Sequence, residues 1–246
     1  PDPEQNGWES THTVIQIICD DKPFLIDSVS MAITEIGLII HRINHPVLVV
    51  ERQADGRIQS IDDDNQGQTG AEAWIHIEVD RQAESSRLHA LEQALRSALD
   101  DVAVAVEDWQ PMQQAARDAR SDLLRHPPAI DQGDLAEVSA FVEWMADNHF
   151  TFLGYRRYDL QRNGQQLTLH AVAKSGLGLL REERSSSSAG QRFAALPPEI
   201  RAEAPDPDPL ILTKSSHRAR VHRPGYMDTI GIKRFNARGE VIGEHR

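Results

Sequence analysis

Apolar and polar positions change their period within the first 50 residues, and this change predicts a strand followed by a helix. Residues 12–19 are β-branched and apolar over a short run, which is typical of a buried strand. The acidic segment 20–23 interrupts the run, and over residues 24–36 the apolar side chains recur at helical spacing. Asp21 is expected to cap this helix and Pro23 to suit its first turn.

A second strand is predicted after Gly37, a residue that tolerates the positive φ found at many helix ends. This strand is long, from Ile39 to Glu51, and we expect a bend at Asn44-His45-Pro46 because Pro46 has no N–H for a ladder. Asp55-Gly56 is a hairpin signal, and the alternating segment 57–61 is expected to pair back.

The pattern continues with a strand at Trp74–Val79, a helix at Ser85–Leu99 and a last strand at Val102–Val106. The resulting order, β-α-β-(β)-β-α-β, is the α+β ferredoxin-like arrangement with an inserted hairpin. Four strands should form an antiparallel sheet with both helices on one face. The other face would then be open to pair with another domain.

The second half of the chain is predicted to start with helices and to continue with strands. Trp109–His126 and Asp134–Asn148 have helical patterns, and Pro127-Pro128 separates them. Strands are expected at 152–158, 167–172, 210–222 and 229–235, followed by a final strand after the turn at 237–239. We therefore predict three parts: a first domain at 1–108, linking helices at 109–149, and a second, mostly antiparallel α+β module at 150–246 that is truncated at its C-terminus.

Several segments between these elements have the composition of loops, linkers or short helices. The segment 62–70 is acidic and rich in Gly and Gln, and 185–190 is rich in Ser. Asn163-Gly164 is a hairpin signal, 196–201 suggests a short helix, and the Pro-rich run 205–209 suggests a stiff spacer.

Composition describes a globular chain and excludes some classes of function. The 246 residues are 39% hydrophobic and 26% charged, and no apolar run approaches the length of a membrane span. The formal net charge of −12 argues against broad nucleic-acid binding, which needs a positive surface. Cys19 is the single cysteine of the sequence, so no internal disulfide can form, and a cytoplasmic location fits. The Pro1-Asp2-Pro3 start and an end inside a predicted hairpin suggest a piece of a longer protein.

Outside the first turn, the candidate metal, dinucleotide and catalytic motifs are each better explained as ordinary structural residues. His41, His45 and His76 could approach one another in a sheet, but no cysteine or paired motif accompanies them, so no metal site is expected. Gly176-Leu177-Gly178 lacks the third glycine and the β-α-β setting of a dinucleotide loop, so we expect a turn. No catalytic serine elbow or triad is recognisable.

A locally basic strand is predicted around residues 214–223. Alternation would place Arg218, Arg220 and His222 on one of its faces. That face either docks an acidic surface or a phosphate, or is the solvated face of an edge strand whose charges discourage aggregation.

Longer strings of the sequence carry a resemblance to a known family. They are Cys19–Val29, Asp147–Tyr155, Leu212–Ser215 and Arg223–Asp228. The first half resembles an ACT domain, a β-α-β-β-α-β regulatory module, and the whole chain resembles the N-terminal regulatory region of the large bacterial NAD-dependent glutamate dehydrogenases. The resemblance implies a parent that converts glutamate and NAD to 2-oxoglutarate, ammonia and NADH. Its catalytic lysine, substrate site and NAD-binding domain would lie outside this chain, which would hold no cofactor itself.

The resemblance also implies where an effector would bind, because ACT domains often bind amino acids at the turn between the first strand and the first helix. The matching residues are Asp20, Asp21, Lys22, Pro23, Phe24, Leu25 and Ile26, together with Gly37. Backbone N–H groups at a helix N-terminus suit an effector carboxylate. However, Phe24 replaces the glycine common in such turns and could fill the pocket, and two aspartates would repel an anion. Amino-acid binding and a purely structural or inter-subunit role therefore both remain open.

Three functions are compatible with these patterns. The first is a non-catalytic regulatory or assembly region of a glutamate dehydrogenase that contacts the rest of its parent chain and sibling subunits. The second is a free-standing amino-acid sensor. The third is an oligomerisation scaffold that pairs through its open sheet face or its edge strands. None of them involves nucleic acid or a membrane.

Overall fold

Two compact units make up the structure, a computed structural model that describes residues 4, 7–62, 70–163, 166–181, 199–201 and 207–246. Unit 1 consists of Pro1–Val102 together with Arg220–Arg223, and unit 2 consists of Ala103–Ala219 and Pro224–Arg246. The division therefore falls six residues before the boundary predicted after residue 108. It also groups the helices of 109–149 with the strands that follow them.

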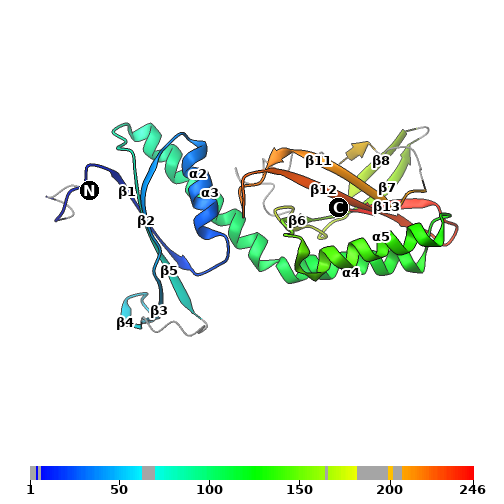
Figure 1. Ribbon diagram of the computed structural model, residues 1–246, viewed down its shortest axis with the longest axis horizontal. Coiled ribbons are helices and arrows are strands. Elements are labelled where there is room, and N and C mark those ends of the chain that lie inside the picture. The colour runs from blue at the N-terminus through cyan, green and yellow to red at the C-terminus, as the bar shows by residue number, and fades with distance from the viewer. Residues whose placement is uncertain (1–3, 5–6, 63–69, 164–165, 182–198, 202–206) are drawn as a thin grey trace. The chain divides into compact units, whose positions relative to one another are not determined.

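Unit 1 has an antiparallel sheet with two helices on one face, as Figure 1 shows. Its elements are β1 (Thr13–Asp20), α2 (Leu25–Glu35), β2 (Ile40–Asn44), β3 (Val47–Arg52), β4 (Ile58–Asp62), β5 (Ala71–Val79) and α3 (Ser85–Glu107), whose last five residues belong to unit 2. The strand order is β1-β5-β3-β4, and β2 also pairs with β5. β2 and β3 are the two halves of the predicted bent strand, broken at His45-Pro46.

Alternation along β5 separates the two faces of this sheet. Ala73, Ile75, Ile77 and Val79 are buried, and the even-numbered residues between them are half-exposed. On the helix side, Val29 and Ile33 of α2 are fully buried. The period-2 pattern of β5 and the 3.6-residue pattern of α2 therefore meet in one core, and the α+β class predicted from the sequence is confirmed.

The predicted strand at Val102–Val106 is wrong, because α3 continues through it to Glu107. The sequence Val-Ala-Val-Ala-Val alternates like a strand. However, Leu91, Leu95, Ala98, Val102 and Ala105 also follow helical spacing, and all five are buried. Burial along the longer helical stripe outweighs the local β preference of the three valines. The full β-α-β-β-α-β order is therefore not present in the described part of this unit.

Unit 2 packs two helices and a π-helical turn against one face of a six-stranded antiparallel sheet (Figure 1). The helical elements are α4 (Trp109–Arg125), α5 (Gln132–Trp144) and η1 (Met145–His149). In spatial order the strands are β10 (Glu199–Arg201), β8 (Gln166–Ala171), β7 (Arg157–Asn163), β13 (Val241–His245), β12 (Tyr226–Phe235) and β11 (Leu210–Arg218). β6 (Gly154–Tyr155) and β9 (Leu177–Gly178) form a separate pair.

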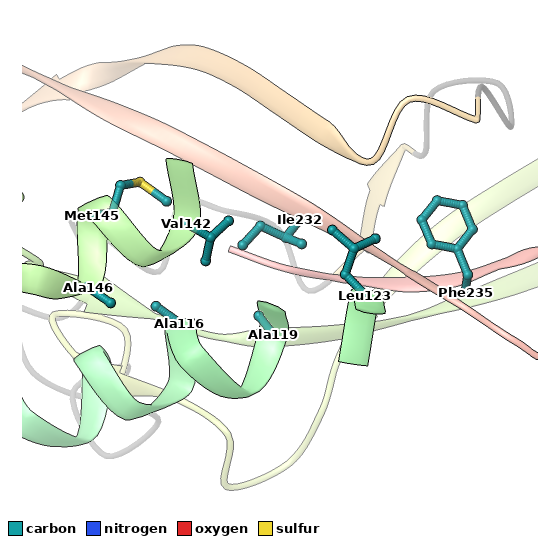
Figure 2. Close-up of a cluster of buried hydrophobic side chains, with 8 residues drawn as sticks. All are labelled: Ala116, Ala119, Leu123, Val142, Met145, Ala146, Ile232 and Phe235. Carbon is teal, nitrogen blue, oxygen red and sulfur yellow. The ribbon is translucent and has the colours of Figure 1, made fainter. Parts of the chain in front are cut away.

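Small side chains let the helices of unit 2 approach the sheet closely. Figure 2 shows the core cluster: Ala116, Ala119 and Leu123 of α4, Val142 of α5, Met145 and Ala146 of η1, and Ile232 and Phe235 of β12. Each of these side chains is buried, so this layer is close-packed.

Several predictions for unit 2 are confirmed and two are wrong. β7 and β8 pair in the register of a two-residue hairpin, and the turn residues 164–165 lie outside the described residues. The segment predicted as a short helix at 196–201 contains a strand at Glu199–Arg201, which pairs with β8. The strand predicted to reach His222 ends at Arg218. Residues 63–69, 182–198 and 202–206, with most of the predicted loop, linker and spacer, lie outside the described part.

Candidate functional site

The turn between β1 and α2 has the backbone of a glycine turn although no glycine is present. Phe24 is the residue before the helix, and its φ of 71° and ψ of 3° lie in the left-handed region. This conformation costs an L-residue about 1–2 kcal/mol. Phe24 therefore has the left-handed conformation that glycine adopts readily, at the position where the resemblance to ACT domains implies a glycine. Its side chain makes no cap hydrogen bond.

The helix begins three residues later than the predicted cap at Asp21 implied, because Phe24 is the residue that precedes its first turn. Asp21 was predicted to cap α2, but its backbone N–H donates to the Ala71 carbonyl at 2.9 Å and the helix starts at Leu25. Pro23 precedes the helix and does not lie in its first turn. The prediction is wrong because residues 21–24 are all non-helical and the left-handed Phe24, not Asp21, leads into the first helical turn.

The charges of the turn are partly compensated within unit 1. Lys22 Nζ lies 3.0 Å from Asp20 Oδ2, and His45 Nε2 lies 3.9 Å from Asp21 Oδ1. The Cys19 thiol beside them is half-buried, and burial raises its pKa, so it remains protonated at neutral pH. These contacts reduce the repulsion that two aspartates would exert on an anion, but Asp20 and Asp21 stay exposed.

The first turn of α2 provides unpaired donors. The first hydrogen bond of the helix runs from the Ser28 N–H to the Phe24 carbonyl at 3.0 Å. In the part of the chain that the structure describes, no hydrogen bond reaches the N–H groups of Leu25, Ile26 or Asp27. The Ser28 hydroxyl is buried and has no hydrogen-bond partner among those residues either. Such donors at a helix N-terminus favour an anionic group.

A segment distant in the sequence covers this turn. Residues 220–223 belong to unit 1, and the His222 ring meets the Phe24 ring edge-on with centroids 4.9 Å apart. Arg220 is 8% exposed and donates through Nη2 to Asp101 Oδ2 at 2.8 Å, while Asp101 is fully buried. Two aromatic rings therefore occupy space beside the helix N-terminus, and a buried ion pair holds the segment that supplies one of them.

This arrangement corrects the prediction of a single basic face on residues 214–223. Arg218 is the last residue of β11, and its guanidinium lies over the Tyr226 ring at 5.2 Å. Arg220 is buried against Asp101, and His222 has a φ of 74° that no strand adopts. The three side chains therefore do not form one face. Sequence alternation alone could not reveal this, because the partners Asp101 and Phe24 lie more than 100 residues away.

The three histidines considered as metal ligands each lie beside a different carboxylate. His41 Nε2 lies 2.8 Å from Asp80 Oδ1, and His76 Nε2 lies 3.6 Å from Glu78 Oε1, whereas His45 faces Asp21. The hydrogen bonds from the Ile39 N–H and from His41 lower the pKa of Asp80. Among the described residues, no group of three or more His, Cys, Asp or Glu side chains is arranged to hold a metal ion.

The glycines of Gly176-Leu177-Gly178 serve close packing. Gly178 has a φ of +58°, and a Cβ there would lie 2.4 Å from the Leu153 carbonyl oxygen. Its N–H donates to Asp108 Oδ2 at 2.6 Å, and Arg181 binds the same carboxylate through two nitrogens. The hydrogen bonds from Arg181 and Gly178 lower the pKa of Asp108. The turn predicted for this segment is wrong, because Leu177-Gly178 is the short strand β9 paired with β6 and the chain turns only at the two residues that follow.

Comparisons with known proteins match both halves of the chain. A family model described as "Glutamate dehydrogenase, ACT1 domain" matches residues 1–95. The NAD-specific glutamate dehydrogenases of Halomonas elongata and Pseudomonas aeruginosa are 36% and 37% identical over 249 and 250 aligned positions, which cover this whole chain. That of Mycobacterium tuberculosis is 25% identical over 94% of the chain.

These relatives are much longer than this chain. The chain spans 15% of the length of the first two relatives and 13% of the third. None of the helices in the described residues is both long enough and apolar enough to cross a membrane.

Proposed function

We propose that the chain, whose residues 1–95 match the ACT1 domain model of glutamate dehydrogenases, is a non-catalytic regulatory and oligomerisation region of such an enzyme. The proposed parent is a cytoplasmic, oligomeric oxidoreductase that converts L-glutamate and NAD to 2-oxoglutarate, ammonia and NADH. The observation that carries this proposal is the alignment of the whole chain with NAD-specific glutamate dehydrogenases at 36–37% identity.

The chemistry of the described side chains supports a role without catalysis. The two buried carboxylates considered above are each paired with an arginine: Asp108 binds Arg181, and Asp101 binds Arg220. The two glycines that might suggest a dinucleotide loop make close contacts within the protein instead, Gly178 with Leu153 and Met112 and Gly176 with Leu180. The catalytic lysine and the NAD site are therefore proposed to lie elsewhere in the parent polypeptide.

An assay of two proteins tests this proposal. The purified 246-residue chain should form no NADH from glutamate and NAD, whereas the full-length parent should form it under the same conditions. Light scattering over a range of concentrations should detect self-association of the chain or of the parent. Glutamate-dependent NADH formation by the chain alone would contradict the non-catalytic role, and a monomeric parent would contradict the oligomerisation role.

An effector role for the β1–α2 turn is a second proposal, supported by the three N–H groups of α2 without partners in the described residues. An amino-acid carboxylate would bind these groups, within the set Asp20, Asp21, Lys22, Pro23, Phe24, Leu25, Ile26 and Gly37. The Phe24 and His222 rings favour the alternative, a turn closed by the protein's own side chains.

Calorimetry with a panel of amino acids decides between an open and a closed turn. If the rings close the site, the native chain should show no binding heat and Phe24→Gly should show some, because that variant removes a ring and keeps the backbone. Binding to the native chain would instead support an open effector site.

The open reading frame around this sequence distinguishes a region of a long enzyme from a free-standing sensor, because a stop codon soon after Arg246 would favour the sensor.

A further inference from the structure

Strand β1 forms the edge of the unit 1 sheet and leaves one side of its backbone open. It pairs with β5 over all eight residues from Thr13 to Asp20, and no other strand in the described residues pairs with it. The position beside β1 is where a split β-α-β fold places its last strand. In this unit the residues expected to form that strand are the end of α3.

The hydrogen-bond pattern identifies which backbone groups of β1 are open. The Asp21 N–H donates to the Ala71 carbonyl, and in the antiparallel register these two residues oppose each other. Odd-numbered residues of β1 therefore bond to β5, and even-numbered residues direct their N–H and C=O groups outward. The outward residues are Val14, Gln16, Ile18 and Asp20. Within the described part of the chain, no hydrogen bond reaches their backbone groups.

Strand β1 lacks the features that protect a free edge from pairing. Its sequence TVIQIICD contains no proline and no lysine, its register with β5 has no bulge, and the Ile18 side chain is 52% exposed. The opposite edge of the sheet differs, because the pairing of β4 with β3 contains an irregularity between Glu51 and Arg52. A long, regular, mostly uncharged edge is typical of a strand that pairs with another segment.

We propose that an extended, mostly uncharged segment of the parent polypeptide, from outside residues 1–246, pairs antiparallel with the outer edge of β1 and completes this sheet. The inference rests on the proposed function, because it needs a parent longer than this chain. The relatives are several times longer, since the chain spans 15% of them. A segment of the same polypeptide is present near β1 at an effective concentration in the millimolar range, and this favours its pairing over that of a separate molecule. Backbone hydrogen bonds supply most of the affinity in such strand addition.

Hydrogen exchange of the β1 amides tests this proposal in the 246-residue chain and in the full-length parent. In the chain, the amides of Val14, Gln16 and Ile18 should exchange on the order of 100-fold faster than those of Ile15 and Ile17. In the parent, both sets should be protected to a similar degree. In the parent, Gln16→Pro removes an outward donor, so it should return Val14 and Ile18 to the fast exchange of the chain. If this variant does not fold, the comparison of the two native proteins still decides.

Each other outcome contradicts the proposal. Outward amides that exchange as fast in the parent as in the chain would show that no segment of the parent covers β1. Protection that rises with the concentration of the isolated chain, together with a dimer mass, would identify a second copy as the occupant. NADH formation by the parent separates this proposal from the proposed function. If the parent forms NADH but its β1 amides are unprotected, only the strand addition is refuted. If the parent forms no NADH but its β1 amides are protected, only the assignment as an enzyme is refuted.

Discussion

At the residue scale, Phe24 combines a strained backbone with a side chain that makes an aromatic contact. Its φ of 71° is a glycine conformation, and its ring packs edge-on against His222. The two effects oppose each other in stability, because the backbone cost falls on any L-residue and the ring contact is specific to an aromatic side chain. They can therefore be separated by two substitutions at one position.

We predict that Phe24→Gly is more stable than Phe24→Ala by about 1 kcal/mol, because both remove the ring and only glycine relieves the strain. Urea unfolding of both variants measures the difference. Ile26, in the first turn of α2, is the matched control, and there alanine should be more stable than glycine by about 1 kcal/mol. The same order at both positions would mean that Phe24 carries no backbone strain.

His245 is a second residue whose surroundings determine its behaviour. Its side chain is 5% exposed, and Tyr155 Oη lies 2.7 Å from its Nδ1. Burial lowers the pKa of His245 to about 4, although Asp122 at 3.7 Å acts in the opposite direction. Burial also raises the pKa of Tyr155 to about 12, so the hydroxyl stays protonated and can donate to the neutral imidazole.

This shift predicts that the chain loses stability in mild acid. The unfolded histidine takes up a proton below its ordinary pKa of about 6.5, whereas the folded one stays neutral until the pH approaches 4. The free energy of unfolding therefore has its full value with respect to His245 above pH 6.5. It decreases as the pH falls, by up to about 3 kcal/mol at pH 4. Urea unfolding between pH 7.5 and 4 measures it. His245→Gln should flatten the dependence, and an unchanged slope in that variant would assign the titration to other groups.

At the element scale, β9 depends on glycine for two distinct reasons. Gly178 has a positive φ, and its missing Cβ also leaves room for the Leu153 carbonyl. Gly239, in the turn between β12 and β13, has a φ of +75° with no atom within 4 Å of a Cβ built there. The two glycines therefore share the conformational requirement and differ in the steric one.

Gly178→Ala should destabilise the chain by at least 2 kcal/mol, and Gly239→Ala by about 1 kcal/mol. The larger cost reflects movement of β9 away from β6 and weakening of the Gly178 N–H bond to Asp108. Thermal or urea unfolding measures both. Equal losses in the two variants would show that the close approach to Leu153 relaxes freely.

At the scale of the whole molecule, unit 1 depends on a segment more than 100 residues away in the sequence. The strands β11 and β12 lie on either side of this segment along the chain. The side chain of Arg220 is almost completely buried and that of Asp101 is fully buried, so their ion pair compensates two charges that are removed from water. Residues 220–223 are therefore part of the stability of unit 1, even though their neighbours in sequence belong to unit 2.

Replacing Arg220 tests this dependence. Arg220→Met should lower the unfolding free energy of unit 1 by about 3 kcal/mol, because it leaves the buried Asp101 without its cation. Arg218→Met is the matched control, since Arg218 is exposed and should cost less than about 1 kcal/mol. Hydrogen exchange of α3 follows the opening of unit 1. Equal effects of the two substitutions would show that Arg220 contributes no more than a surface arginine.

Much of the fold was predictable because periodicity and turn residues act locally. The alternation in Trp74–Val79, the stripe of α2 and the Asn163-Gly164 signal each depend on neighbours within a few residues, and β5, α2 and the β7–β8 pairing follow. At the candidate site, the sequence predicted the position of the turn. It did not predict the left-handed Phe24 or the His222 ring beside it.

By itself the sequence determined the α+β class, the strand–helix–strand opening and the family resemblance, because these depend on residue spacing and on strings of residues. Tertiary structure decided two matters. Val102–Val106 is compatible with either a strand or a helix, and packing of the α3 stripe selected the helix. Arg220 and His222 are compatible with a strand, and the distant Asp101 and Phe24 drew them into unit 1 instead. In both cases the local preference is worth a few tenths of a kcal/mol to about 1 kcal/mol per residue, and burial of non-local contacts exceeds it.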